Sequence, residues 1–94
     1  MTAREITLNI AVNLGRLARW VGEGKTIRVD QFLTETGEFL KQLEATLKSE
    51  RFNKTFLIFK NKFEHLRNNK NRNDEWAEEA LTWANILTHR AKLA

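Results

Sequence analysis

The chain has 94 residues, a formal net charge of +4, no cysteine and no proline. This length suits one small domain spanning residues 1–94, because single hydrophobic cores commonly organise chains of about 50 to 200 residues. Hydrophobic residues make up 41% and charged residues 30%, which excludes a disordered or fibrous chain. The absence of cysteine excludes disulfides, thiolate zinc sites, iron–sulfur clusters and thiol nucleophiles, so packing alone must hold the fold.

The first residues do not resemble a signal peptide. Arg4 and Glu5 are adjacent, and the stretch that follows is interrupted by Asn9 and Asn13. No apolar run approaches the ~20 residues that a membrane-spanning helix needs. We therefore expect a cytoplasmic protein that has no membrane partner.

The first segment has a helical period. Its seam consists of apolar residues at steps of four or three: Ile6, Ile10, Leu14, Leu17 and Val21. Four further residues widen this face: Leu8, Ala11, Val12 and Ala18. Thr2 followed by Glu5 predicts a capping box, and the sequence GEGK over residues 22–25 predicts a break. We expect a helix over about residues 3 to 21.

The second segment has a stricter, heptad-like period, which is typical of a helical bundle or a coiled coil. Its seam consists of Val29, Leu33, Thr36, Leu40, Leu43 and Leu47. Thr26 and Asp30 are both suitable N-cap residues, so two starting points stay open.

The third segment continues with an aromatic seam. Its members are Phe52, Phe56, Phe59, Phe63 and Leu66. On one continuous helix the step from Leu47 to Phe52 would rotate the apolar stripe by about 140°. We therefore predict a turn near residues 48–51, with Ser49 as the N-cap of a separate helix. Residues 55–59 also have high β-propensity, so a strand there is the alternative.

Residues 67–74 contain four asparagines and predict a loop, because asparagine competes for backbone hydrogen bonds. Asn73 or Asp74 then caps a fourth helix. Its seam consists of Trp76, Ala80, Trp83, Leu87 and Ala91.

The four segments predict an all-α fold, a small four-helix bundle with up-down-up-down antiparallel topology. Two helical hairpins exchanged across a dimer would use the same pattern.

Few residues are available for catalysis. The only serine, Ser49, is explained by its cap position. Neither His65 nor His89 follows a glutamate by three residues, which excludes the di-iron site of four-helix oxidases. The tripeptide at residues 24–26 resembles part of a phosphate loop, but Arg19 stands where its first glycine should be.

Three glutamates near the start of the fourth predicted helix are the remaining candidate metal ligands: Glu75, Glu78 and Glu79. An acidic helix start is the simpler explanation, because the helix dipole favours negative charge there. We therefore expect a protein that is not an enzyme and uses no cofactor and no metal.

Positive charge is concentrated in the middle of the chain. Residues 48–72 contain eight basic residues against Glu50 and Glu64, a net charge of +6, whereas the rest of the chain has a net charge of −2. On a helical wheel Arg51, Lys54, Lys62 and His65 share a sector of about 80°. Such a stripe predicts contacts with nucleic-acid phosphates, with a solvated helix face as the alternative. The predicted phosphate-binding residues are Arg51, Lys54, Lys62, Arg67, Lys70 and Arg72.

Residues 56–59 are four successive apolar residues, which is more than one helix stripe can bury. Leu57 and Ile58 point away from the aromatic seam. The third helix therefore either lies centrally in the fold or presents these two residues to a protein partner. Trp20, beside Arg16 and Arg19, could stack on a base, anchor a partner or close the bundle, and the last is the simplest.

We therefore expect a non-enzymatic helical-bundle subunit of a larger assembly that contacts nucleic-acid backbone through a basic helix face. Its size and charge are similar to those of small non-catalytic subunits of ribonucleoprotein assemblies, although no specific motif supports this. The alternative is a protein–protein adaptor or a homo-oligomeric regulator with no nucleic-acid role.

Overall fold

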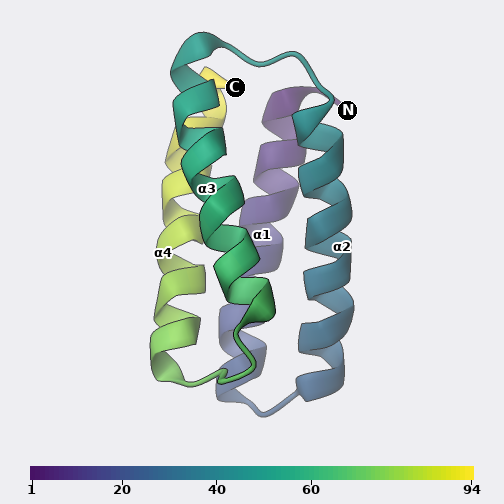
Figure 1. Ribbon diagram of the computed structural model, residues 1–94, viewed down its shortest axis with the longest axis vertical. Coiled ribbons are helices and arrows are strands. Elements are labelled where there is room, and N and C mark those ends of the chain that lie inside the picture. Colours follow the sequence, from purple (N-terminus) through teal and green to yellow (C-terminus); the bar gives the residue numbers. More distant parts are fainter.

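The computed structural model describes residues 1–94 as four antiparallel helices that alternate in direction along the long axis (Figure 1). They are α1 (Ala3–Gly22), α2 (Thr26–Glu44), α3 (Glu50–Asn68) and α4 (Asp74–Arg90), followed by the short 3-10 helix η1 (Ala91–Leu93). The predicted all-α four-helix bundle is confirmed. The strand considered for residues 55–59 is wrong, since these residues lie inside α3. Each of the four α-helices is too short or too polar to cross a membrane.

The start of α1 has the predicted capping box. The Glu5 backbone N–H donates to Thr2 Oγ1 at 3.2 Å, and the Thr2 backbone N–H donates to Glu5 Oε1 at 2.9 Å. The start of α2 differs from both predictions, because Lys25 holds the cap position and makes no side-chain hydrogen bond. The tight turn before it explains the difference. Gly24 adopts a φ of 70°, and the Lys25 backbone N–H donates to the Trp20 carbonyl, so Thr26 is already helical.

The connection between α2 and α3 begins earlier than predicted. Leu47, predicted as the last seam residue of the second helix, is 94% exposed in this connection. α2 ends at Glu44 because the Lys48 ammonium donates to the carbonyls of Leu43, Glu44 and Thr46 and so caps the helix.

Ser49 is the N-cap of α3, as predicted. Its hydroxyl accepts a hydrogen bond from the Phe52 backbone N–H at 3.1 Å and donates to the Leu93 carbonyl at 2.5 Å. The start of α3 is therefore tied to the end of the chain.

The four helices share one hydrophobic core of 21 buried residues. α1 lies closely against both α2 and α4. Its contact with α4 is close because both helices present small buried residues, among them Ala3, Ala11, Ala80 and Ala84. α3 stands farther from its neighbours, since its seam consists of large phenylalanines. α1 thus packs most closely against two neighbours, and the central position considered for the third helix is not observed.

The last connection joins α3 to α4 through residues 69–73. Asn73 is the N-cap of α4, and its side-chain oxygen accepts from the Trp76 backbone N–H at 3.0 Å. The Trp76 indole N–H donates to the Leu66 carbonyl at 2.9 Å, and both groups are buried. This bond satisfies a carbonyl in the last turn of α3, which has no partner within the helix.

The capping box predicts a pH dependence. Its hydrogen bonds, first that from the Thr2 backbone and then that involving the Thr2 side chain, hold the pKa of Glu5 below its ordinary value. Because this pKa is lower in the folded state, ionised Glu5 stabilises the fold at neutral pH, and the contribution is lost as pH falls through the lowered pKa. The Tm difference between wild type and Glu5→Gln should shrink between about pH 6 and pH 3. A difference independent of pH would contradict this.

Trp76→Phe tests the bond between α4 and α3. The substitution leaves the buried Leu66 carbonyl without a partner, which costs about 1–3 kcal/mol. Trp83→Phe is the matched control, because Trp83 is also buried and donates no hydrogen bond within the protein. Urea unfolding followed by circular dichroism should show the larger loss of stability for Trp76→Phe. Equal losses would mean that the hydrogen bond contributes nothing.

Candidate nucleic-acid interface

The solvent-facing side of α3 carries the predicted basic stripe. With the phenylalanines buried, Arg51, Lys54, Lys62 and His65 lie on one exposed face at helical spacing. Ile58 lies in the middle of this face and is 56% exposed. The sequence pattern predicted that the cations contact nucleic acid and that Ile58 contacts a protein partner. Both belong to the same surface.

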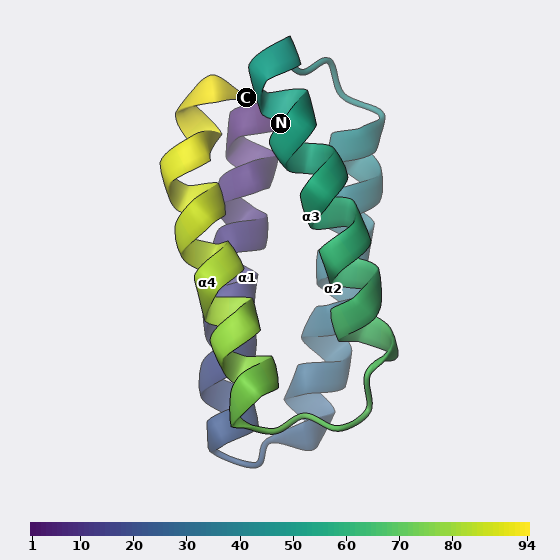
Figure 2. The same ribbon diagram turned by 60° about the vertical axis from the view of Figure 1, so that its left-hand side comes forward.

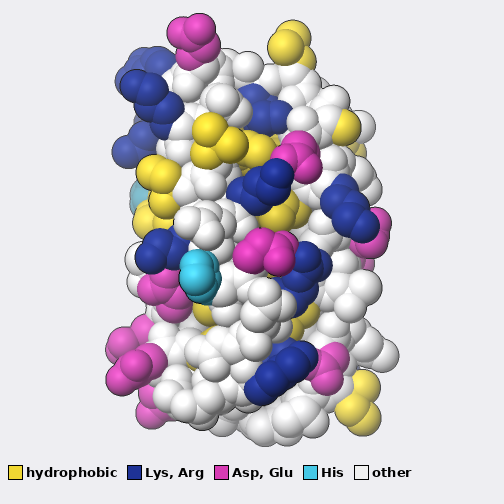
Figure 3. Space-filling model, viewed as in Figure 1, with side chains coloured by type: hydrophobic (Ala, Val, Ile, Leu, Met, Phe, Trp, Pro, Cys, Tyr) yellow, Lys and Arg dark blue, Asp and Glu magenta, His cyan; other side chains and the backbone are white.

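The end of α4 extends this stripe. A hollow of about 390 Å³ between α3 and α4 is lined by Thr55, Ile58, Trp83, Ile86, His89 and Arg90. Lysine and arginine side chains gather where α3 begins and α4 ends (Figure 3). Arg90 was missed as a site residue because positive charge is concentrated in residues 48–72 of the sequence, and Arg90 lies outside that segment. The antiparallel topology was the signal that could have placed it beside the start of the third helix.

We call this surface the basic face and define it by Arg51, Lys54, Lys62 and Arg90. None of these four side chains forms an ion pair within the protein, and none lies over an aromatic ring. The first three are exposed on α3, and Arg90 is exposed in the last turn of α4. Their charges are therefore free to meet an external anion.

Arg67, one of the predicted phosphate-binding residues, makes contacts inside the protein. Its guanidinium is 2.5 Å from a Glu64 carboxylate oxygen and 5.4 Å from the centre of the Phe63 ring. It also lies against Gly37 of α2, where an added Cβ would come within 2.8 Å of a guanidinium nitrogen. The side chain thus fills the space that the glycine leaves between α3 and α2.

Arg72 is likewise held inside the protein. Its guanidinium forms an ion pair with Asp30 at 2.6 Å and lies 5.8 Å from the centre of the Trp76 ring. Its side chain is only 17% exposed, and its Nε atom is buried without a hydrogen-bond partner. Arg72 therefore braces the last connection against α2.

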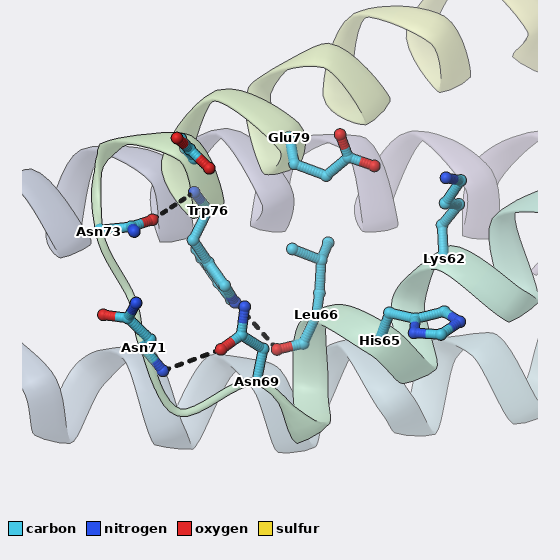
Figure 4. A pocket seen from close by; sticks show the side chains of 9 residues that line it. Lys62, His65, Leu66, Asn69, Asn71, Asn73, Trp76 and Glu79 are labelled. Carbon is cyan, nitrogen blue, oxygen red and sulfur yellow. Dashed lines mark hydrogen bonds between the residues drawn. The ribbon is translucent and has the colours of Figure 1, made fainter.

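The other end of the α3–α4 groove has mixed charge. A hollow of about 480 Å³ there is lined by Lys62, His65, Leu66, Asn69, Asn71, Asn73, Glu75, Trp76 and Glu79 (Figure 4). The Asn69 side-chain oxygen accepts from the Asn71 backbone N–H at 2.9 Å, so part of the asparagine loop stabilises itself. Lys70 is exposed in this loop. The carboxylates of α4 disfavour a phosphate at this end, where Lys62 lies, whereas Arg51, Lys54 and Arg90 lie toward the other end.

The acidic start of α4 carries the three glutamates that were considered as metal ligands, Glu75, Glu78 and Glu79. The protein contains no group of three or more histidine, aspartate or glutamate side chains arranged to hold a metal ion.

Trp20 is 5% exposed and packs edge-on against Phe32, with ring centres 4.7 Å apart, so it closes the bundle. Leu57 is 56% exposed, about 100° around α3 from Ile58.

In comparisons with protein families, curated proteins and solved structures, we found no match to this chain.

Arg72→Ala tests the bracing role of Arg72. The substitution removes a side chain that is mostly buried against Trp76, and we expect a loss of roughly 1–2 kcal/mol in the free energy of unfolding. Lys70→Ala, two residues away and exposed, should change stability by less than about 0.5 kcal/mol. Urea unfolding of the two variants makes the comparison, and an equally small effect for both would refute the bracing role.

Proposed function

We propose that this protein is a non-enzymatic subunit of a larger assembly that binds nucleic-acid backbone through the basic face. The observation that carries the proposal is that its four cations are exposed and unpaired on one side of the bundle. Five other basic residues have carboxylate partners within the protein: Lys25, Lys41, Lys60, Arg67 and Arg72. Unpaired cations that gather on one surface are the electrostatic signature of polyanion binding.

The dimensions of the basic face suit a phosphate backbone. At 1.5 Å per residue, Arg51 and Lys62 are separated by about 16 Å along α3. One strand of a duplex presents a phosphate every ~3.4 Å of helix axis, so the stripe spans about five phosphates. Contacts with phosphates carry no sequence information, so we expect binding with little sequence preference. Ile58, between the cations, would lie against sugars or the edges of unpaired bases.

A second candidate is an acidic protein partner. It is favoured by the apolar surface among the cations, where Ile58 is 56% exposed and lines the hollow of about 390 Å³ together with Trp83 and Ile86. An amphipathic helix with acidic flanks would match an apolar strip bordered by Lys54 and Arg90.

The test is a fluorescence-anisotropy titration with labelled duplex and single-stranded oligonucleotides at about 50 and 200 mM salt. The test variant is Arg51→Gln/Lys54→Gln/Arg90→Gln. The matched control, Arg4→Gln/Lys25→Gln/Lys41→Gln, removes the same charge from α1, α2 and the turn between them. Wild type and control should bind with a steep salt dependence. In the test variant the slope of log K against log salt should be less steep by about 2–3.

Two outcomes would overturn the proposal. One is the absence of salt-sensitive binding by the wild type at about 50 mM salt, and the other is an equal loss in the control variant. In either case the acidic partner becomes the better candidate. Ile58→Asp does not separate the two candidates, because the new carboxylate would weaken an acidic helical partner and would also repel phosphates. Weak oligonucleotide binding by Ile58→Asp alone would not distinguish them, so the three-residue variant decides.

A further inference from the structure

A second exposed surface lies across α1 and α4, which run side by side and antiparallel (Figure 2). Leu8 and Val12 of α1, predicted to widen the core face, are 36% and 52% exposed instead, and Leu81 of α4 is 49% exposed. At 100° per residue these two α1 positions lie opposite the buried seam, beyond the reach of any neighbouring helix. The bundle therefore leaves an apolar strip on two adjacent helices without a partner.

The same surface is hollowed between the two helices. A depression of about 480 Å³ is lined by Gly15, Ala18, Arg19, Asp74, Ala77, Glu78 and Leu81. The small residues keep the groove open, since no atom lies within 4 Å of the position that a Cβ on Gly15 would occupy. A side chain from another protein could enter the groove without displacing anything.

The charges of this surface are self-complementary. Arg19 lies on α1, whereas Asp74 and Glu78 line the same depression from α4, and no ion pair joins them within the chain. The carboxylates would repel a nucleic acid, and Arg19 would repel a purely basic partner. A second copy of the chain carries both charges, so each charged group can face one of the opposite sign. If the two-fold axis runs along the bundle, α1 of each copy faces α4 of the other, and Arg19 meets Glu78 twice.

The size of the surface is also sufficient. The principal-axis extents are 37 × 20 × 19 Å, so one long side has a projected area of roughly 700 Å². Stable complexes commonly bury about 600 to 1,000 Å² per partner, and this side falls within that range. We propose that the α1–α4 surface is the interface of a homodimer, formed by Leu8, Val12, Gly15 and Leu81 and oriented by Arg19 and Glu78. This inference does not depend on nucleic-acid binding, because it uses the other side of α4.

The test is sedimentation equilibrium at micromolar to millimolar concentration, with charge-swap variants. Wild type should show a species of twice the 11.0 kDa chain mass. Arg19→Glu and Glu78→Arg should each weaken dimerisation at least about tenfold, because each places two like-charge pairs in the interface. Arg19→Glu/Glu78→Arg should restore it, which also shows that the swapped residue at position 19 is compatible with folding. Lys25→Glu/Glu38→Lys, away from this surface, is the matched control and should dimerise as wild type does.

Apolar variants provide a second, independent readout. Val12→Lys and Leu81→Lys replace exposed side chains, so the monomer should keep its Tm while the dimer is lost. A monomeric wild type at every concentration would overturn the inference. So would a double swap that fails to restore dimerisation, or a dimer that survives Val12→Lys and is abolished by Ile58→Lys. The last result would place the interface on α3.

Discussion

The rotation of α3 about its own axis is the constraint on which the rest of the structure depends. Phe52, Phe59 and Phe63 are wholly buried, and together they leave α3 only one orientation toward the core. This orientation determines which of the other α3 residues face solvent and which face a neighbouring helix. Burial of each ring stabilises the fold by about 1.5–3 kcal/mol, which is far more than an exposed cation of the basic face contributes to stability. The basic face is therefore a consequence of aromatic packing.

The size of the core residues also decides where the surface is hollow. α1 and α4 approach closely through buried alanines such as Ala11 and Ala80, whereas the phenylalanines hold α3 away from its neighbours. α3 crosses the bundle obliquely, so a groove opens beside it along α4 (Figure 1). Tight packing on one side and wide packing on the other thus come from the same principle, that side-chain volume sets the distance between helices.

Local features of the fold could be predicted from the sequence, because the interactions behind them span three or four residues. The caps at Thr2, Ser49 and Asn73 are of this kind, and all three are formed. The predicted end of the second helix was wrong because the Lys48 ammonium donates to three backbone carbonyls. The spacing of apolar residues does not reveal such a contact. Leu8 and Val12 were assigned inward because the apolar pattern of α1 is wider than the face that its neighbours cover.

The candidate site was only half predictable, for a related reason. Arg51, Lys54 and Lys62 share a face by helical spacing alone, and their exposure needs no knowledge of other helices. The partners of Arg67 and Arg72 include Gly37 and Asp30 on α2, and the neighbours of Arg90 lie on α3. Such contacts join distant parts of the chain. Whether a basic residue is free or engaged is therefore decided by tertiary structure, and charge patterning cannot distinguish the two.

The two proposed surfaces divide α4 between them. Ile86 and Arg90 face the groove beside α3, whereas Ala77, Glu78 and Leu81 face α1. A dimer formed through α1 and α4 would thus leave the basic face uncovered on each copy. A two-fold axis along the bundle turns one basic face by 180° relative to the other, so the two point in opposite directions. One straight strand cannot reach both, and the dimer would either hold two separate strands or have a single flexible strand wrap around it.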